Sequence, residues 1–235
     1  MIKFKFSIQV LCPENTSTSI ELEMANVIDW ARENKMTVNL LKTVELVFRR
    51  PNISNDLLPS VMSDVKRVGA AKLLGVHLTQ NLSFSQHIDA VGTVCNQRLY
   101  LLSQLKRQGL DLSALDSVFN AIIANKILYA LPVYYGYLTA TSLYEEMLQR
   151  IFKRADRRGF TVREYDLEAL AVNAQYDLFH NSCSTDHCLN HLYTANRKPA
   201  GSMQLRHIGH NFALPTIHLE FNKRHFVARV LFDYV

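Results

Sequence analysis

The first eighty residues alternate between two spacings of apolar side chains. Residues 1–12 place apolar side chains at every second position, which is the period of a half-buried strand. Over residues 18–34 the period becomes that of an amphipathic helix, opened by the capping-box pattern Thr18-x-x-Glu21. Strand-like spacing returns over residues 36–48 and again over residues 72–78. The pattern predicts a small unit of short strands and one helix.

The strand expected over residues 36–48 carries a prediction about its two faces. Val44, Leu46 and Phe48 fall on one face of the strand, and Glu45 falls on the other. Because the apolar face of a half-buried strand packs inward, Glu45 is expected to face water. Pro51 and the polar residues after it predict a loop that ends the strand.

Three consecutive helices are expected in the middle of the chain. The first and third are followed by Gly109 and Gly159, and glycine is favoured just beyond a helix C-terminus. Short links between the three predict a helical bundle. The first helix has the apolar stripe Phe84, Ile88, Val91, Cys95, Leu99, Leu102 and Leu105. The second is capped by Asp111 or Ser113, has the stripe Leu115, Val118, Phe119, Ile122 and Ile123, and stops at Pro132. The third runs from about Tyr134 to Arg157.

The last part of the chain, residues 160–235, is expected to hold one more helix and a basic tail. The helix is predicted from Leu167 to about Tyr193, before a Lys198-Pro-Ala-Gly loop. The whole pattern therefore predicts an α+β fold that is predominantly helical. It has three regions: a small antiparallel sheet with one helix in residues 1–80, the bundle in residues 81–159, and a helical and irregular extension in residues 160–235.

Composition narrows the cellular setting. The chain is 48% hydrophobic and 20% charged, values of a globular protein. A net charge of +5 suits an anionic partner, although such an excess is equally common in proteins that bind no nucleic acid. The four cysteines show no disulfide spacing, and no stretch approaches ~18 apolar residues. We expect an intracellular chain, in the nucleus or cytoplasm, with free thiols and no membrane partner.

Several short motifs carry a resemblance to a known family when they are taken together. Their order and spacing resemble the region that follows the active site in reverse transcriptases of non-LTR retrotransposons, the jockey-like LINE class. The likeness covers nearly the whole chain, and its motifs are specific in combination but weak singly. The motifs are Trp30–Met36 (WARENKM), Val38–Thr43 (VNLLKT), Leu73–Val76 (LLGV), Gln97–Gly109 (QRLYLLSQLKRQG), Leu205–Pro215, Phe221–Phe226 and Val230–Phe232.

The resemblance implies a fragment of an RNA-directed DNA polymerase without polymerase activity. Residues 1–80 would be the end of the palm, 81–159 the thumb and 160–235 a C-terminal extension. The family binds Mg²⁺ through paired aspartates, and Phe6 and Ser7 stand at those positions here. Another metal-binding aspartate of the family belongs to a motif before Met1. Since two-metal phosphoryl transfer needs several converging carboxylates, we expect no catalytic residue and no bound cofactor.

Other site residues follow from the same resemblance. Lys42 matches a motif lysine that lies near the triphosphate in the family, and its alternative interpretation is a solvent-facing lysine. Leu74 and Gly75 match the hairpin that grips the primer, and the alternative is a simple strand bend.

A set of basic residues predicts binding to an RNA–DNA or DNA duplex. If they face one groove, they can neutralise backbone phosphates, and nearby tyrosines can stack on bases or sugars. The alternative is a solvated helix face on a helical scaffold or protein-interaction module with no nucleic-acid role. The basic residues are Arg98, Lys106, Arg107, Lys153, Arg154, Arg157 and Arg158, and the tyrosines are Tyr100, Tyr134, Tyr135 and Tyr137.

Two sequence patterns resemble metal-binding sites, and neither predicts a bound metal. The His87-x-Asp89 pair has the form used by iron oxygenases, but it opens a long amphipathic helix rather than a strand. A His/Cys cluster invites a zinc interpretation, yet most of its members share one predicted helix, so a tetrahedral site is not expected. The His/Cys cluster comprises His180, Cys183, His187, Cys188 and His191, with His207 and His210 as a possible second donor set.

The strands expected in residues 1–48 leave a sheet edge open, and an open edge predicts self-association.

Overall fold

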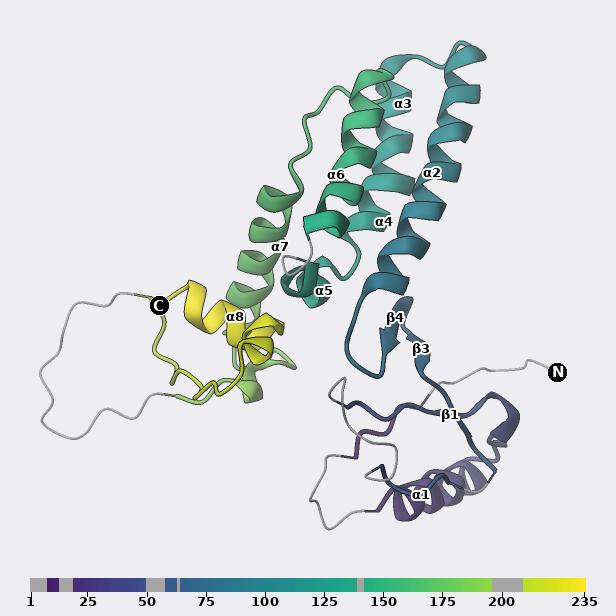
Figure 1. Cartoon of the computed structure of the whole chain (residues 1–235), viewed down its shortest axis with the longest axis vertical. Helices are drawn as coiled ribbons and strands as arrows, with labels where there is room; N and C mark the ends of the chain where they lie inside the picture. The colour runs from purple at the N-terminus through teal and green to yellow at the C-terminus, as the bar shows by residue number, and fades with distance from the viewer. Residues whose placement is uncertain (1–7, 13–18, 50–57, 63, 139–141, 196–208) are drawn as a thin grey trace, which may run out of the picture. The chain divides into compact units, whose positions relative to one another are not determined.

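The chain forms two compact units, residues 1–82 and residues 83–235. Among the described residues helices dominate, and the strands form two small two-stranded sheets (Figure 1), which confirms the mostly helical α+β class. Residues after 160 belong to the same compact unit as the bundle helices. The computed structural model describes residues 8–12, 19–49, 58–62, 64–138, 142–195 and 209–235.

The first unit is built around helix α1 (Ile20–Glu33), which confirms the helix predicted there. The side chain of Ser19 caps it by accepting a hydrogen bond from the Leu22 amide at 3.2 Å, while Thr18, the predicted cap, lies outside the described residues. Asn34 closes the helix, and its side-chain amide donates to the Trp30 carbonyl at 2.8 Å. Polar capping at both ends compensates for the modest apolar burial of this helix.

The strand predicted over residues 36–48 is mostly replaced by other structure. A 3₁₀ turn, η1 (Leu40–Lys42), precedes the two-residue strand β1 (Val44–Glu45), which pairs in parallel with β2 (Lys66–Arg67). The predicted faces are also wrong, because Glu45 is only 7% exposed whereas Val44 is 47% exposed. Residues 8–12 form no strand, and the rest of the strand predicted over residues 1–12 lies outside the described residues.

Arg67 stabilises the buried carboxylate of Glu45 through a bidentate ion pair. Arg67 Nε and Nη2 each donate to a different carboxylate oxygen at 2.8 Å. The same guanidinium donates to the carbonyls of Pro59 and Ser60, at 2.8 and 2.9 Å. The hydrogen bond to Glu45 raises the pKa of Arg67 above its usual value. A bidentate pair of this kind fixes one orientation of two side chains, so it ties β1, β2 and the segment before β2 together.

The strand predicted over residues 72–78 is instead a β-hairpin. β3 (Ala70–Leu73) pairs antiparallel with β4 (Val76–Thr79), and Leu74 and Gly75 form the turn. Both turn residues have positive φ, 46° for Leu74 and 88° for Gly75, as a two-residue type I′ turn requires. The periodicity was wrong here, since it indicated one strand, whereas the hairpin expected at Leu74 and Gly75 from the family resemblance is present.

The second unit begins with the predicted bundle. Helix α2 (Ser85–Arg107) buries its apolar stripe, and α3 (Leu112–Phe119) continues through a π-helical turn (Asn120–Ala124) into α4 (Asn125–Leu128). The Asp111 carboxylate caps α3 by accepting from the amides of Ser113 and Ala114 at 3.1 and 3.2 Å. The first two helices are therefore confirmed, although the second contains a π turn that its periodicity does not reveal.

The third predicted helix is two helices, α5 (Leu131–Leu138) and α6 (Ser142–Arg157), so that prediction was wrong at its start. Pro132 lies in the first turn of α5 rather than after a helix, a position where its missing N–H costs nothing. Within the described residues, no single helix has the length and apolar character to cross a membrane. The helical segments Leu112–Leu128 and Leu131–Leu138 meet both criteria only when taken together, as a pair bent by 64°.

Helix α7 (Leu167–Ser182) is eleven residues shorter than predicted, since it was expected to reach Tyr193. The Asn190 side chain donates to the Cys183 carbonyl at 3.0 Å, satisfying a backbone acceptor left open where the helix ends. The described residues beyond it include the 3₁₀ turns η4 (Asn190–Leu192) and η5 (Glu220–Arg224) and helix α8 (Phe226–Asp233).

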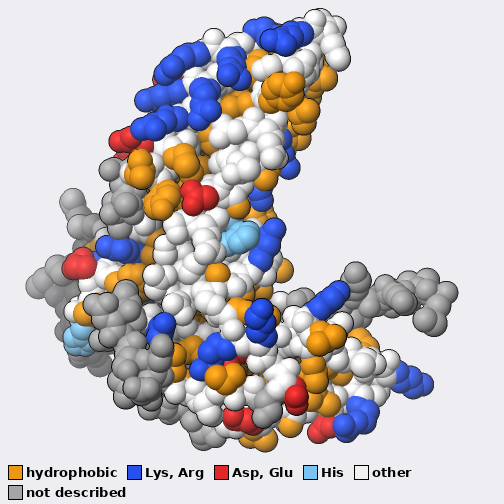
Figure 2. Space-filling view, turned by 45° about the vertical axis from the view of Figure 1, so that its right-hand side comes forward, with side chains coloured by type: hydrophobic (Ala, Val, Ile, Leu, Met, Phe, Trp, Pro, Cys, Tyr) orange, Lys and Arg blue, Asp and Glu red, His pale blue; other side chains and the backbone are white. Residues whose placement is uncertain are grey.

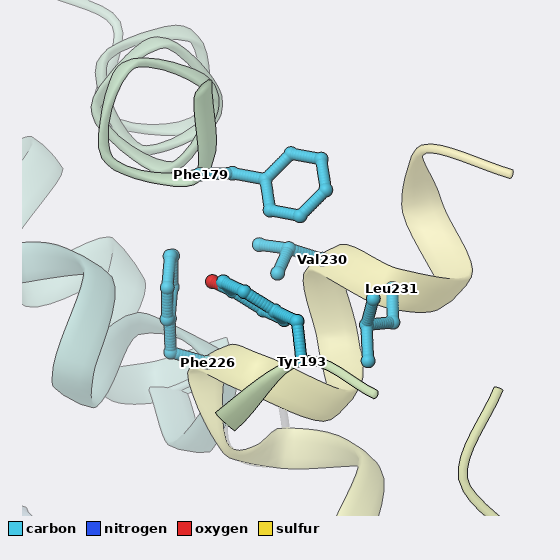
Figure 3. Close-up of a cluster of buried hydrophobic side chains, with 5 residues drawn as sticks. All are labelled: Phe179, Tyr193, Phe226, Val230 and Leu231. Carbon is cyan, nitrogen blue, oxygen red and sulfur yellow. The ribbon is translucent and has the colours of Figure 1, made fainter. Parts of the chain in front are cut away.

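The end of the chain packs as a small aromatic core rather than extending as a tail. Side chains from α7, α8 and the segment after α7 meet in one cluster (Figure 3). Within it, the hydroxyls of Tyr193 and Ser182 lie 2.7 Å apart, so the buried phenol has a hydrogen-bond partner. The buried members of the cluster are Phe179, Tyr193, Phe226, Val230 and Leu231.

Candidate nucleic-acid interface

Helices α2 and α6 lie side by side and run in the same direction, so both end at one end of the second unit (Figure 1). Arg154 Nη1 of α6 donates to the Asn96 side-chain oxygen of α2 at 2.9 Å. Further along, Lys106 Nζ of α2 donates to the Arg158 carbonyl at 2.6 Å. These two contacts fix the register of the helices over their last three turns. We call this end of the second unit the basic end.

Both helices finish in the same glycine-dependent motif. Gly109 and Gly159 have φ of 90° and 60°, and each donates its amide back to the carbonyl three residues earlier, at 3.1 and 2.7 Å. The next residue, Leu110 or Phe160, donates to the carbonyl five residues earlier. This pairing is a Schellman motif, which terminates a helix sharply and satisfies its last carbonyls. The positions of the basic side chains near each terminus are thereby fixed by local sequence.

Two of the predicted binding residues have structural partners instead. Lys106 donates to the Arg158 and Gly159 carbonyls, at 2.6 and 3.3 Å, and its ammonium lies 5.9 Å from the centre of the Phe160 ring. Half-buried Arg98 donates to the carbonyl of Ile122 in the π-helical turn. Such bonds direct these two side chains towards backbone carbonyls of neighbouring segments. Lys106 and Arg98 therefore hold the helices together, and the remaining cations are the better candidates for ligand contact.

The remaining predicted cations form one exposed surface. Arg107, Lys153, Arg157 and Arg158 are exposed and make no ion pair or side-chain hydrogen bond with another residue that the structure describes. Arg154 is exposed too, with its one bond to Asn96. In Figure 2 lysine and arginine side chains gather at this end of the helices. We define the basic face as Arg107, Lys153, Arg154, Arg157 and Arg158.

One structural explanation for these charges is compensation of the helix dipoles. A helix C-terminus carries roughly half a negative elementary charge, so α2 and α6 together present about one. The five cations of the basic face exceed that several-fold. The nearest acid in the sequence, Asp156, is a single exposed carboxylate. A substantial positive excess therefore remains for an anionic ligand.

A buried carboxylate fixes the chain just after α6. Asp116 of α3 accepts from the Thr161 hydroxyl at 2.6 Å and from the Val162 amide at 3.2 Å, and Arg163 Nε lies 3.4 Å away. The hydrogen bond from Thr161 lowers the pKa of Asp116 below its usual value, against the opposing effect of burial. The turn that carries Arg157 and Arg158 is thus anchored to a second helix.

The four tyrosines proposed for stacking separate into different environments. Tyr134 is fully buried and Tyr135 nearly so, which contradicts the prediction that they stack on a ligand. Tyr137 is half-buried, with its ring centroid 5.0 Å from that of Phe84 and 5.5 Å from that of Phe221. Tyr100, on α2, is 62% exposed. Tyr100 alone retains a ring face for a ligand.

The other predicted site residues belong to the first unit. Lys42 is exposed at the end of η1, and Leu74 and Gly75 form the hairpin turn with the Leu74 side chain largely exposed. Phe6 and Ser7 lie outside the described residues.

The structure gathers no metal-binding cluster among the residues that it describes. Because α7 ends at Ser182, His187 and His191 do not share a helix with His180, and the His187 Nδ1 accepts from the Leu189 amide at 3.1 Å. His210 bonds the Leu231 carbonyl at 2.8 Å, and His207 is not among the described residues. His87 is a core residue of α2, edge-on to Tyr134 at 5.0 Å.

Comparison with known proteins yields no family model, no curated protein and no solved structure that matches this chain.

Sequence reasoning missed Asn96 and Asp116, whose roles depend on contacts between distant segments. It also missed Arg150, which precedes Lys153 by three residues on α6 and extends the basic stripe, although it pairs with Glu146 at 2.8 Å. Its i, i+3 spacing was a usable signal.

Proposed function

We propose that the basic end of the second unit binds the phosphate backbone of a nucleic-acid duplex without performing chemistry on it. One observation carries the proposal: the basic face presents five exposed cations on two helices whose ends are locked in register. Such a surface neutralises phosphates by releasing counterions, which is the main source of sequence-independent affinity. From Asn96 to Arg107, α2 advances about 16 Å at 1.5 Å per residue, which matches roughly five base-pair steps of 3.4 Å.

The proposal also assigns an origin to the chain. In this account it is a fragment of a retrotransposon reverse transcriptase whose thumb retains its grip on an RNA–DNA or DNA duplex. The support is the ordered set of motifs in residues 30–76 and 97–109 and the position of the basic residues at the ends of helices in the corresponding region. Phe6 and Ser7 cannot ligate Mg²⁺ as paired aspartates would, so we expect no nucleotide incorporation.

The alternative function is a helical scaffold that binds protein. Its support is a set of exposed apolar residues near the same end, Leu101, Leu112 and Val162. A protein partner held by these side chains would depend weakly on salt, since apolar burial is not screened. Salt dependence therefore separates the two functions.

The decisive experiment is fluorescence anisotropy of the full chain with a labelled RNA–DNA hybrid across a salt series. We expect log K to fall linearly with log salt, by about 0.9 for each phosphate contact. Replacing Arg107, Lys153, Arg157 and Arg158 together by glutamine should reduce the slope by about 2 to 4. These four are chosen because their side chains hold no other described part of the chain, so the fold should be preserved.

A matched control removes the same charge elsewhere. Arg32, Lys35, Lys66 and Lys72 are exposed cations of the first unit, and their joint replacement by glutamine also lowers the net charge by four. The control should retain the wild-type salt slope. Absence of binding by the folded protein, or equal slopes for both variants, would refute the proposal and favour the scaffold.

A further inference from the structure

We infer that Tyr100 stacks on an unpaired base, so that the basic end prefers a duplex bearing a single-stranded extension over a blunt duplex. This inference rests on the proposed function and specifies its ligand. The aromatic residues near the bundle differ in their surroundings. Most are packed against other rings, whereas Tyr100 has no described ring contact and is 62% exposed. An exposed aromatic ring among cations is the usual combination at single-stranded nucleic-acid sites.

The place of Tyr100 on α2 puts it on the side of the helix that borders α6. It follows Asn96 by four residues and precedes Arg107 by seven, so the three share one side of the helix. Asn96 is also the residue that accepts the hydrogen bond from Arg154 of α6. Tyr100 therefore lies about one turn beyond the contact between Asn96 and Arg154, and about two turns before Arg107 on its own helix.

The distribution of exposed charges favours binding of a nucleic acid at the end of α2 that contains Tyr100. Towards the start of the same side lies the exposed carboxylate Asp89, and near the start of α6 lie Glu145 and Glu146. Towards the other end lie the five cations of the basic face, which outnumber the exposed carboxylates there, Asp111 and Asp156. A phosphate backbone is therefore attracted to the last three turns of α2 and α6 and repelled from the first turns. Tyr100 lies near the boundary between the region that attracts a phosphate backbone and the region that repels it.

This position suits an unpaired base better than a paired one. Inside a duplex both faces of each base are covered by neighbouring bases, so a ring on a helix surface cannot reach them. A base at a strand end or in an extension has a free face, and stacking of such a base on an aromatic side chain contributes about 1–3 kcal/mol. The cations can hold the duplex backbone while the ring takes the first unpaired base.

The test compares two probes that share one duplex, one blunt and one with a short 3′ or 5′ extension carrying 2-aminopurine at its first unpaired position. The wild-type chain should bind the extended probe more tightly and change the 2-aminopurine emission. Tyr100→Ala should weaken binding of the extended probe about 5- to 100-fold, leave the blunt probe unchanged, and leave both salt slopes unchanged. Tyr100→Phe should behave as wild type because the ring is retained.

Leu101→Ala is the matched control. Leu101 is the next residue, is 54% exposed, and is rotated by about 100° away from the border with α6. Its removal should affect neither probe. Equal affinity of wild type for the two probes, or undiminished binding of the extended probe by Tyr100→Ala, overturns the inference while leaving the proposed function intact. Failure of wild type to bind either probe overturns both.

Discussion

Asp116 shows how a single buried carboxylate positions an exposed surface. Its oxygens accept from the Thr161 hydroxyl and the Val162 amide, which lie just beyond the Schellman motif at Gly159. The basic residues before that glycine are otherwise held by the bond between Arg154 and Asn96 and by the Lys106 ammonium, which donates to the Arg158 carbonyl at 2.6 Å. The orientation of the turn therefore depends in part on a buried acid that lies outside the basic face.

The stability conferred by Asp116 should depend on pH. Its folded-state pKa is lowered by the hydrogen bond from Thr161, so its contribution is fully present above the unfolded value near 3.8 and is lost as pH falls through the folded value. Asp116→Asn should lower the free energy of unfolding at pH 7 by roughly 1–3 kcal/mol, and the difference from wild type should shrink below pH 3.8. Urea titrations at several pH values measure it.

Asp177→Asn supplies the control for the Asp116 prediction. Asp177 is an exposed carboxylate on α7, so its substitution should change stability by less than about 0.5 kcal/mol at every pH. A constant gap between Asp116→Asn and wild type from pH 7 to pH 3 would mean that the carboxylate charge is not what holds the turn.

At this scale, sequence predicts the residues whose roles are local. Asp111, Gly109 and Gly159 act on backbone groups within five residues, and the capping rules identify them. Asp116 and Glu45 were missed because their partners are far along the chain, 45 residues away for Thr161 and 22 for Arg67. In an alternating pattern Glu45 reads as a solvent-facing residue, and only the bidentate arginine makes its burial favourable.

Among the elements, α8 packs on α7 through the aromatic core, and one arginine of α8 also bonds α5 and α7. The Arg229 guanidinium donates to the Gln175 side chain, the Arg224 carbonyl and, at 2.8 Å, the Pro132 carbonyl. Burial lowers the pKa of Arg229, against the influence of Asp233 and neighbouring tyrosines. The guanidinium lies directly against Gly136, where any Cβ would overlap it and the Arg224 carbonyl. Glycine is required at this position by space rather than by backbone angle.

Gly136→Ala should therefore weaken the attachment of α8 to α5. We expect a loss of roughly 2–4 kcal/mol in the free energy of unfolding, since the methyl group must displace a hydrogen-bonded, partly buried cation. Thermal unfolding followed by circular dichroism at 222 nm would record the loss as a lower Tm. Gly69→Ala is the comparison, because a Cβ there meets no atom within 4 Å. Equal Tm values for the two variants would contradict this account of Gly136.

Element boundaries were predictable where a capping residue or glycine marks them, as for α1, α2 and α3. They were not predictable at two places. The apolar run across Pro132 hid the start of α5, and the polar run after Ser182 hid the end of α7. In both cases another segment makes contact, Arg229 with α5 and Asn190 with the end of α7. The turn at Leu74 and Gly75 was missed by periodicity but expected from the family resemblance. Periodicity reports which face is buried but not where a partner interrupts the element.

In the whole molecule, apolar burial is concentrated in the second unit. Among the described residues of the first unit, the buried apolar side chains are Ala31, Val65 and Val76. All of the largest fully buried side chains belong to the second unit, from Ile88 and Leu99 onward. The first unit also exposes Leu41, Val61 and Leu74. Since stability follows apolar burial, the two units should differ in stability, and the first unit offers the apolar surface and short strands through which we propose self-association.

Trp30 makes this difference measurable. It is the single tryptophan of the chain and lies on α1, so its fluorescence reports the first unit, whereas ellipticity at 222 nm is dominated by the helices of the second. In a urea titration at low protein concentration, the fluorescence midpoint should fall below the ellipticity midpoint, because the unit with the smaller core unfolds first. Raising the concentration should move only the fluorescence midpoint if the first unit self-associates, since association stabilises the folded form. Coincident midpoints at all concentrations would show that the chain unfolds as one cooperative body, and would contradict the lower stability expected for the first unit.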